Sequence, residues 1–102
     1  MNDDAEITLR EIEKRIKAHK ALLRAKYKVK ELGIFGSYLR GKQKKNSDLD
    51  LLVEFSVPVS LFDFISLENH LSQILGLKVD LVMKDSLKPR IKDKVIGEAL
   101  YV

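Results

Sequence analysis

The chain has 102 residues, enough for one domain with a modest core and too few for two. Hydrophobic residues make up 45% and charged residues 33%, and no apolar run approaches the roughly 20 residues that span a membrane. The acidic start, "MNDDAEITLR", lacks the apolar segment of a secretory signal. The absence of cysteine excludes disulfides, a thiolate zinc site and a cysteine nucleophile. We therefore expect a single cytoplasmic domain over residues 1–102, in which any metal ligands are oxygen or histidine.

The net charge of +4 comes from the first half of the chain. Residues 1–47 carry 13 Lys and Arg against 6 acids, whereas residues 48–102 carry 6 against 9. From Lys14 to Lys30 there are eight basic residues and no acid. Such a run fits an anionic partner such as nucleic acid, and it also fits a solvated helix face, which the pattern alone favours.

Apolar residues at spacings of three and four predict one amphipathic helix over about residues 6–26. Its buried stripe is Leu9, Ile12, Ile16, His19 and Leu23. Thr8 with Glu11 fits a capping box, and Asp3 or Asp4 fits the start of a longer helix. We expect His19 to be a partly buried structural residue rather than a metal ligand.

Two strands follow this helix. "KVKELGIF" predicts a short strand that ends at Gly36, and "DLDLLVEF" predicts a second strand with strict alternation. One face of the second strand carries Leu49, Leu51, Val53 and Phe55. The other face carries Asp48, Asp50, Leu52 and Glu54.

The second half predicts a helix, a strand and a final helix. Ser60 caps a helix that has Asp63 at its third position and ends at Gly76. Its core stripe is Phe64, Leu67, Leu71 and Ile74, and His70 falls off this stripe toward solvent. "LKVDLVM" predicts the third strand. Pro89 starts the last helix, whose residues able to face the core are Ile91, Val95 and Ala99.

This order of elements predicts an α+β (α/β-like) domain, with a small mixed β-sheet packed against helices. Three strands make a minimal sheet. We therefore expect an additional edge strand from either the segment Val57–Val59 or the C-terminal "ALYV".

Asp48 and Asp50 project from one face of a strand, with Cα atoms about 6.5 Å apart. Mg²⁺ prefers oxygen ligands and is usually bound by one or two carboxylates together with substrate phosphates. Asp80 is a third candidate, because an aspartate flanked by core residues costs free energy unless it is paired or metal-bound. The alternative is that Asp80 faces solvent on an edge strand.

A candidate phosphate site precedes the aspartates. Gly36 lets the backbone pass close to a ligand, and Ser37 offers a hydroxyl and an N–H at the start of a short helix. Arg40 carries a bidentate guanidinium suited to phosphate oxygens. The basic residues that follow are expected to be solvated loop residues rather than phosphate ligands; they are Lys42, Lys44 and Lys45.

Gly36-Ser37, ten further residues, Asp48-x-Asp50 in an apolar strand, and Asp80 in another strand resemble the nucleotidyltransferase superfamily that includes DNA polymerase β. More closely, "GSYLRGKQKKNSDLDLLVEF" and "KVDLVMKDSLKPRIKDKVIGEALYV" are similar to the minimal nucleotidyltransferase (MNT) family. The resemblance covers nearly the whole chain and implies a polymerase β-type nucleotidyltransferase fold.

The resemblance also implies roles for the motif residues. The nucleotide-binding residues would be Gly36, Ser37, Arg40 and Ser47. The catalytic and metal-binding residues would be Asp48, Asp50 and Asp80. The family transfers AMP from ATP, with pyrophosphate as leaving group and Mg²⁺, expected as two ions, as cofactor.

The short members of this family are implied to be the antitoxin half of a type VII HEPN/MNT toxin–antitoxin pair. The partner would be a HEPN-domain RNase encoded by the adjacent gene, modified on a tyrosine. A protein acceptor is favoured because the predicted elements leave little chain to enclose a small-molecule acceptor. Two alternatives stay open: a non-catalytic antitoxin that acts by binding, and a transferase for RNA or a small molecule whose basic helix 14–30 engages nucleic acid. Self-association also stays open, and no membrane partner is expected.

Overall fold

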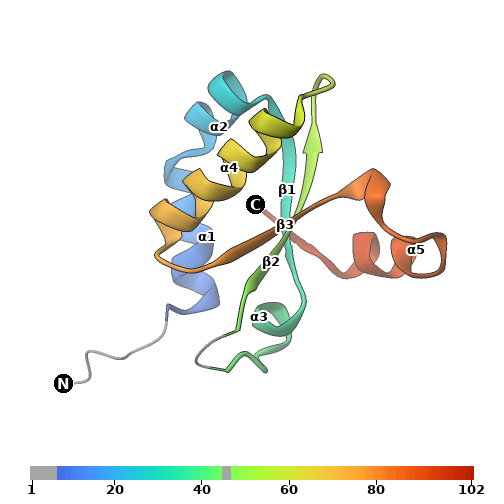
Figure 1. The fold of residues 1–102 in the computed structure, drawn as a ribbon. Coiled ribbons are helices and arrows are strands. Elements are labelled where there is room, and N and C mark those ends of the chain that lie inside the picture. Colours follow the sequence, from blue (N-terminus) through green and yellow to red (C-terminus); the bar gives the residue numbers. More distant parts are fainter. Residues whose placement is uncertain (1–6, 45–46) are drawn as a thin grey trace.

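The computed structural model describes residues 7–44 and 47–102 (Figure 1). The elements are α1 (Leu9–Ala18), α2 (Lys20–Tyr27), β1 (Val29–Phe35), α3 (Ser37–Arg40), β2 (Leu49–Phe55), α4 (Leu61–Leu75), β3 (Val79–Met83), the 3-10 helix η1 (Lys84–Ser86), α5 (Pro89–Glu98) and β4 (Leu100–Tyr101). The predicted α+β fold with a small mixed sheet is confirmed. Within the described residues, none of the helices has the length and apolar character needed to cross a membrane.

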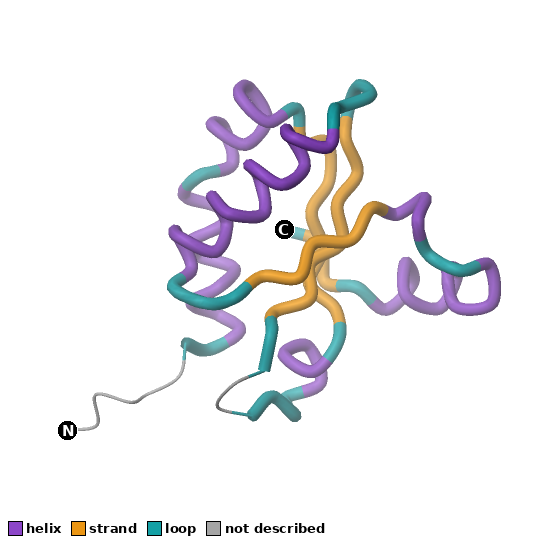
Figure 2. The backbone as a smooth tube through the Cα atoms, viewed as in Figure 1, coloured by secondary structure: helices purple, strands orange, loops and turns teal. Residues whose placement is uncertain are grey.

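The four strands form one sheet in the order β3-β2-β1-β4. β1 pairs antiparallel with both β2 and β4, whereas β2 and β3 run parallel. Helices α1, α2 and α4 lie on one side of this sheet, and α5 projects away from the other side (Figures 1 and 2). The C-terminal segment supplies the expected edge strand, β4, while Val57–Val59 forms no strand.

The hydrophobic core lies between the three helices and the sheet, because each contributes one apolar face. The predicted stripes of the helices and β2 are buried there: Ile12, Ile16, Leu23, Leu67, Leu71, Leu49, Leu51 and Val53. Burying a side chain of this size contributes about 1.5–3 kcal/mol relative to leaving it exposed. Leu52 is also buried, but on the opposite face of β2, where it pairs with Gly33.

The prediction of one continuous helix over residues 6–26 is wrong, because the helix breaks at His19. The Nδ1 atom of His19 lies 2.9 Å from the carbonyl oxygen of Arg15, the acceptor that the backbone N–H of His19 would use in a continuous helix. That N–H donates instead to the carbonyl of Ile16, at 3.0 Å. The competition between side chain and backbone ends α1 and starts α2 at a new angle. His19 is half-buried, as predicted.

Thr8 is the N-cap of α1, and its hydroxyl oxygen accepts a hydrogen bond from the Glu11 N–H at 3.1 Å. The alternative caps, Asp3 and Asp4, lie outside the described residues. At α4 both halves of the predicted capping box between Ser60 and Asp63 form. The helix starts therefore follow the capping signals in the sequence.

His70 does not face solvent as predicted. Its ring is half-buried and stacks on Tyr27, with the ring centroids 5.1 Å apart. The ring of His19 lies edge-on to His70 at 6.3 Å. The apolar stripe of α4 does not predict this contact, because α2 packs on α4 beside the stripe rather than on it.

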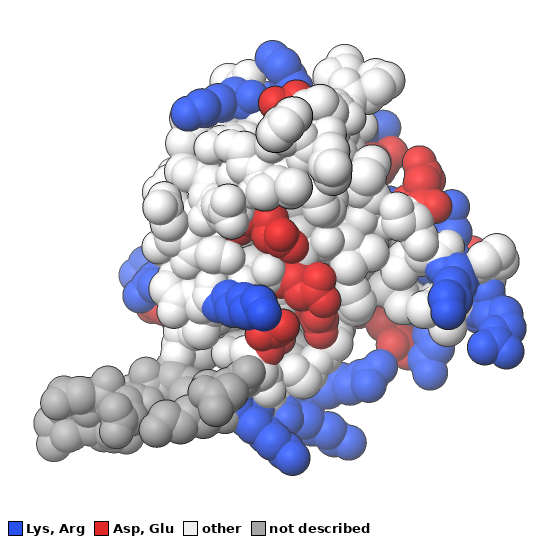
Figure 3. Space-filling view, viewed as in Figure 1, with Lys and Arg blue, Asp and Glu red and all other residues white. Residues whose placement is uncertain are grey.

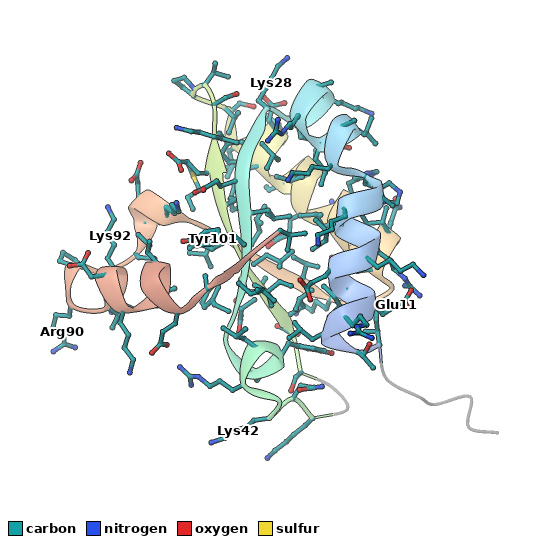
Figure 4. The ribbon with its side chains drawn as sticks, turned by 180° about the vertical axis from the view of Figure 1, so that it is seen from behind. Glu11, Lys28, Lys42, Arg90, Lys92 and Tyr101 are labelled. Atoms are coloured by element: carbon teal, nitrogen blue, oxygen red, sulfur yellow. The ribbon has the colours of Figure 1, made fainter. Side chains whose placement is uncertain are left out.

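The prediction that Ile91, Val95 and Ala99 face the core is also wrong. Helix α5 starts at Pro89 as expected but buries none of its residues, and Ile91 is 45% exposed. Figure 4 shows the Arg90 side chain of α5 directed away from the sheet, and Lys92 is directed toward η1, where its Nζ lies 3.5 Å from Oδ1 of Asp85. The helical face of the sheet is already covered by α1, α2 and α4, so α5 has no core to join.

The two ends of the segment that carries α5 are fastened to the open face of the sheet. The Lys84 Nζ atom donates to Glu31 and to Glu54, at 2.5 and 3.3 Å, and lies 5.1 Å from the ring centroid of Tyr101. These contacts raise the pKa of Lys84, chiefly through the hydrogen bond with Glu31. The Tyr101 hydroxyl in turn donates to the Ile96 carbonyl at 2.8 Å. η1 and β4 are thereby held together over β1 and β2.

Candidate active site

The open face of the sheet brings the three predicted aspartates together. Asp50 in β2 pairs directly with Asp80 in β3, and Asp48 precedes Asp50 by two residues on the same face. Asp80 is exposed on the edge strand of the sheet, as the alternative interpretation predicts, and its role as a metal ligand stays a prediction. Figure 3, in which the β3 edge of the sheet is in front, shows acidic side chains gathered near the centre of the view, with basic side chains beside and below them.

The aspartates perturb one another. The pKa of Asp50 is raised to about 6, first by its partial burial and then by the charges of Asp80 and Asp48 and a hydrogen bond with Asp80. Concentrating negative charge in this way disfavours the ionised carboxylate of Asp50. A cation bound between these residues would relieve that cost.

Gly36 packs directly against Asp50. It has φ 79° and ψ −150°, a conformation that residues with a side chain rarely adopt. A Cβ atom added to Gly36 would lie 2.1 Å from Oδ2 of Asp50, far inside van der Waals contact. The preceding residue, Phe35, pairs with Asp50 across β1 and β2. The glycine-serine turn and the two-aspartate strand are therefore parts of one compact arrangement.

Ser37 and Arg40 stand at the two ends of α3, which is only four residues long. A helix of this length spans roughly 5 Å, so both side chains can approach one ligand. Tyr38, with 3% exposure, anchors α3 in the core, and the Lys42 N–H donates to the Ser37 carbonyl at 2.9 Å. Arg40 is exposed, and Lys42 points away from the sheet (Figure 4).

Ser47 shapes the loop that leads into β2. Its hydroxyl oxygen accepts from the Lys44 N–H at 2.7 Å, and its own N–H donates to the Lys44 carbonyl at 2.9 Å. Lys45 lies outside the described residues.

Two residues of α4 that sequence reasoning did not assign hold the strand of Asp80 in place. The Ser72 hydroxyl accepts from the Val79 N–H at 3.0 Å, and Glu68 Oε2 accepts from the Leu81 N–H at 2.8 Å. Both N–H groups point outward from the edge strand. Val79 and Leu81 are two residues apart in a strand, and Glu68 and Ser72 are about one turn apart in a helix. These two separations are similar in length, so each N–H meets an acceptor. The sequence signal, two acceptors four residues apart on a helix, is too common to be noticed alone.

Lys78 is a second unassigned residue of the site. Its Nζ lies 3.9 Å from Oδ2 of Asp48. Alternation along the third strand puts Lys78 on the same face as Asp80. Its proximity to Asp48, however, depends on the pairing of β2 with β3.

The residues of this face fit a hard divalent cation. Carboxylate oxygens are the donors that Mg²⁺ prefers, and the pKa of Asp50 is raised first by partial burial and then by the neighbouring carboxylates, both of which a bound cation would offset. In the described part of the chain no group of three or more His, Cys, Asp or Glu side chains is arranged to hold a metal ion by itself. Two carboxylates completed by substrate phosphate oxygens are the usual arrangement for Mg²⁺, and Asp48 with Asp50 matches it.

The comparisons with known proteins agree with this geometry. The chain is 52% identical over 98 residues to the protein adenylyltransferase MntA of Thermococcus cleftensis, covering 96% of this chain and 99% of that protein. A solved structure described as a candidate minimal nucleotidyltransferase has 34% identity and a TM-score of 0.80, over 94% of this chain and 97% of the other.

A chain of a toxin–antitoxin structure solved with AMP-PNP has 28% identity and a TM-score of 0.68, over 85% of this chain and 70% of that one. The family model described as nucleotidyltransferase domain matches residues 10–102. The protein therefore belongs to the nucleotidyltransferase-domain family.

Proposed function

We propose that this protein is a Mg²⁺-dependent protein adenylyltransferase that transfers AMP from ATP to a tyrosine of a HEPN-domain RNase toxin and serves as its antitoxin. The main support for this proposal is that Gly36, Asp50 and Asp80 lie together on one face of the sheet. The name of the Thermococcus cleftensis relative and the AMP-PNP bound in the toxin–antitoxin structure support it. The HEPN partner follows from the family resemblance.

The chain's residues divide the work. The backbone of Gly36 and the hydroxyl of Ser37 would hold the triphosphate, with the Arg40 guanidinium and the Ser47 hydroxyl as further nucleotide contacts. Asp48 and Asp50 would hold Mg²⁺, and Asp80 would complete the set beside the acceptor, with two ions bound in all. When bound, the metal would lower the pKa of the acceptor hydroxyl and neutralise charge that develops on the phosphates.

In the transfer step, the acceptor oxygen forms a bond to the α-phosphorus of ATP. The bond between that phosphorus and the α,β-bridging oxygen breaks, and pyrophosphate leaves with the electron pair. Asp80, which is exposed on the edge strand, accepts the proton of the hydroxyl. Gly36 and α3 keep the triphosphate chain on the opposite side of Asp50 from this edge.

A protein acceptor is supported by two features of the surface. The aspartates lie on an open face rather than inside a closed pocket, which suits an acceptor that brings its own surface. In addition, apolar side chains lie exposed at the start of α4, with Leu61 71% and Phe62 85% exposed and Val57 and Ile65 beside them in the chain. Exposed apolar groups of this kind mark protein interaction sites.

The test uses ATP labelled at the α-phosphate, Mg²⁺ and the protein encoded by the adjacent gene. Wild type should label that protein, and Asp48→Asn should lose at least 100-fold of the rate. Asp93→Asn removes an exposed carboxylate of α5 and should retain full activity. Equal labelling by wild type and Asp48→Asn would contradict the mechanism. Toxin neutralisation without labelling would indicate an antitoxin that acts by binding, and labelling of RNA would indicate a nucleic-acid acceptor.

A further inference from the structure

Lys78 lies directly before β3 and shares one face of the sheet with the three aspartates. Asp50 pairs with Asp80 in the parallel ladder, and the Leu49 N–H donates to the Lys78 carbonyl at 2.9 Å. Because side chains alternate along a strand, Lys78 lies on the side of Asp80 and opposite Asp48. The backbone therefore fixes three acids and one lysine in a two-by-two arrangement.

The ammonium group of Lys78 contacts one of these acids. Nζ lies 3.9 Å from Oδ2 of Asp48, and within residues 7–44 and 47–102 this is the only ion pair made by any of the three aspartates. Arg40 and Lys42, at the nearby turn, form none with them. Among the described residues, Lys78 is thus the cation that pairs with one of the three aspartates.

This ion pair contributes little to the stability of the fold. The side chain of Lys78 is 81% exposed and that of Asp48 is 42% exposed, and exposed pairs contribute about 0.2–1 kcal/mol. A lysine ammonium is a compact charge on a flexible stem, and it binds phosphates as a point charge. The contact can therefore be exchanged at low cost when either group meets a stronger partner.

We propose that Lys78 is a positioning residue that changes partner when the substrate arrives. In the free protein it neutralises Asp48. When Asp48 becomes a metal ligand, the ammonium turns to the polyphosphate of the bound nucleotide, approaching it from β3 while Arg40 approaches from α3. This inference rests on the proposed function, since it requires that the site takes a metal and a nucleotide.

The proposed change of partner by Lys78 has two measurable consequences in the full chain. In Lys78→Met, Mn²⁺ binding without nucleotide, followed by electron paramagnetic resonance of the free ion, should become about two- to fivefold tighter, because a competitor for Asp48 is lost. Binding of AMP-PNP with Mg²⁺, followed by calorimetry, should become about tenfold weaker, because a charged contact to phosphate is lost.

Two variants serve as controls. Lys78→Arg keeps the charge and should keep the nucleotide affinity within about threefold of wild type. Lys20→Met removes one positive charge from α2, which lies on the helical side of the sheet, and should leave both affinities unchanged. Equal unfolding midpoints for Lys78→Met and wild type would establish that the fold is intact.

If Lys78→Met leaves either the Mn²⁺ affinity or the AMP-PNP affinity unchanged, the proposed change of partner by Lys78 is wrong. It is also wrong if Lys20→Met shows the same shifts. If the wild type binds neither Mn²⁺ nor the nucleotide, the proposed function fails as well. If the wild type binds both and Lys78→Met behaves like it, only the role of Lys78 fails.

Discussion

Gly36 stands where a side chain has no room, because the Asp50 carboxylate occupies the space. Gly36→Ala should therefore combine backbone strain of about 1–3 kcal/mol with displacement of Asp50. We expect adenylyl transfer to fall at least 100-fold, since a shift of about 1 Å at a reacting centre has effects of that size. Unfolding in denaturant and a labelling assay measure the two effects separately.

Gly41→Ala is the matched control for this prediction. Gly41 also has a positive φ, 69°, but a Cβ atom there would meet no atom within 4 Å. The variant should lose similar stability while keeping far more activity than Gly36→Ala. Equal loss of activity in the two variants would attribute the effect to strain alone.

Asp50 should make the metal-free protein less stable near neutral pH. Its pKa is about 6 in the folded protein and 3.8 as the ordinary value, so the folded state holds the proton more tightly. The stability that this proton contributes is fully present below about pH 4 and is lost as the pH rises through 6. The carboxyl is only half-buried, so solvent screening reduces the effect to about 1 kcal/mol.

Asp50→Asn should therefore abolish transfer and yet raise the free energy of unfolding by about 1 kcal/mol at pH 7.5 in EDTA, with little change at pH 4. Denaturant titrations at the two pH values measure this difference. Asp93→Asn, which removes an exposed carboxylate of α5, is the control variant. A destabilised Asp50→Asn protein at pH 7.5 would contradict the electrostatic account.

Individual site residues could be predicted where the motif spacing is specific. Gly36, Asp48 and Asp50 could be found in this way, and the structure brings Gly36 and Asp50 into contact range. Lys78 could not be found, because its position beside Asp48 depends on the register between strands that are separated by a whole helix. Spacing along the chain carries no information about that register.

At the scale of elements, α4 clamps the strand that carries Asp80. Ser72→Ala leaves the Val79 N–H without its acceptor, which costs about 1 kcal/mol. We also expect the rate of transfer to fall severalfold, because β3 is an edge strand and the clamp limits its movement. Ser66→Ala, at an exposed position of the same helix, is the control. Identical unfolding and rates in both variants would show that the clamp does not act on the site.

The lengths and starts of most elements could be predicted from periodicity and capping residues, as the capping box at Ser60 illustrates. The break at His19 could not, because it arises when an imidazole takes the acceptor of a backbone N–H. The exposure of α5 could not either. An amphipathic pattern such as that of Ile91 and Val95 is the same whether or not a partner face exists.

At the scale of the whole molecule, the start of α4 presents apolar side chains to solvent. Phe62→Asp should leave unfolding within about 0.5 kcal/mol of wild type, because the ring is 85% exposed. Binding of the toxin should weaken at least tenfold, while binding of AMP-PNP with Mg²⁺ stays unchanged. Calorimetry with each ligand separates the two.

Asn69→Asp places the same charge at another exposed position of α4 and should leave toxin binding unaffected. Full toxin affinity in Phe62→Asp would exclude this end of the molecule as the contact surface.

The segment from η1 to β4 is attached to the sheet at its two ends. Lys84 fixes one end over Glu31 and Glu54, and two residues of β4 fix the other beside β1. Between these two attachments no residue of α5 is fully buried, so the orientation of α5 depends on its two ends and on the hydrogen bond from Tyr101 to the Ile96 carbonyl rather than on a core. A macromolecule docked on the open face could tilt this helix without disturbing the packing on the helical side. The domain thus has two parts: the sheet with three helices around the hydrophobic core, which carries the three aspartates, and the segment of α5, which lies outside that core.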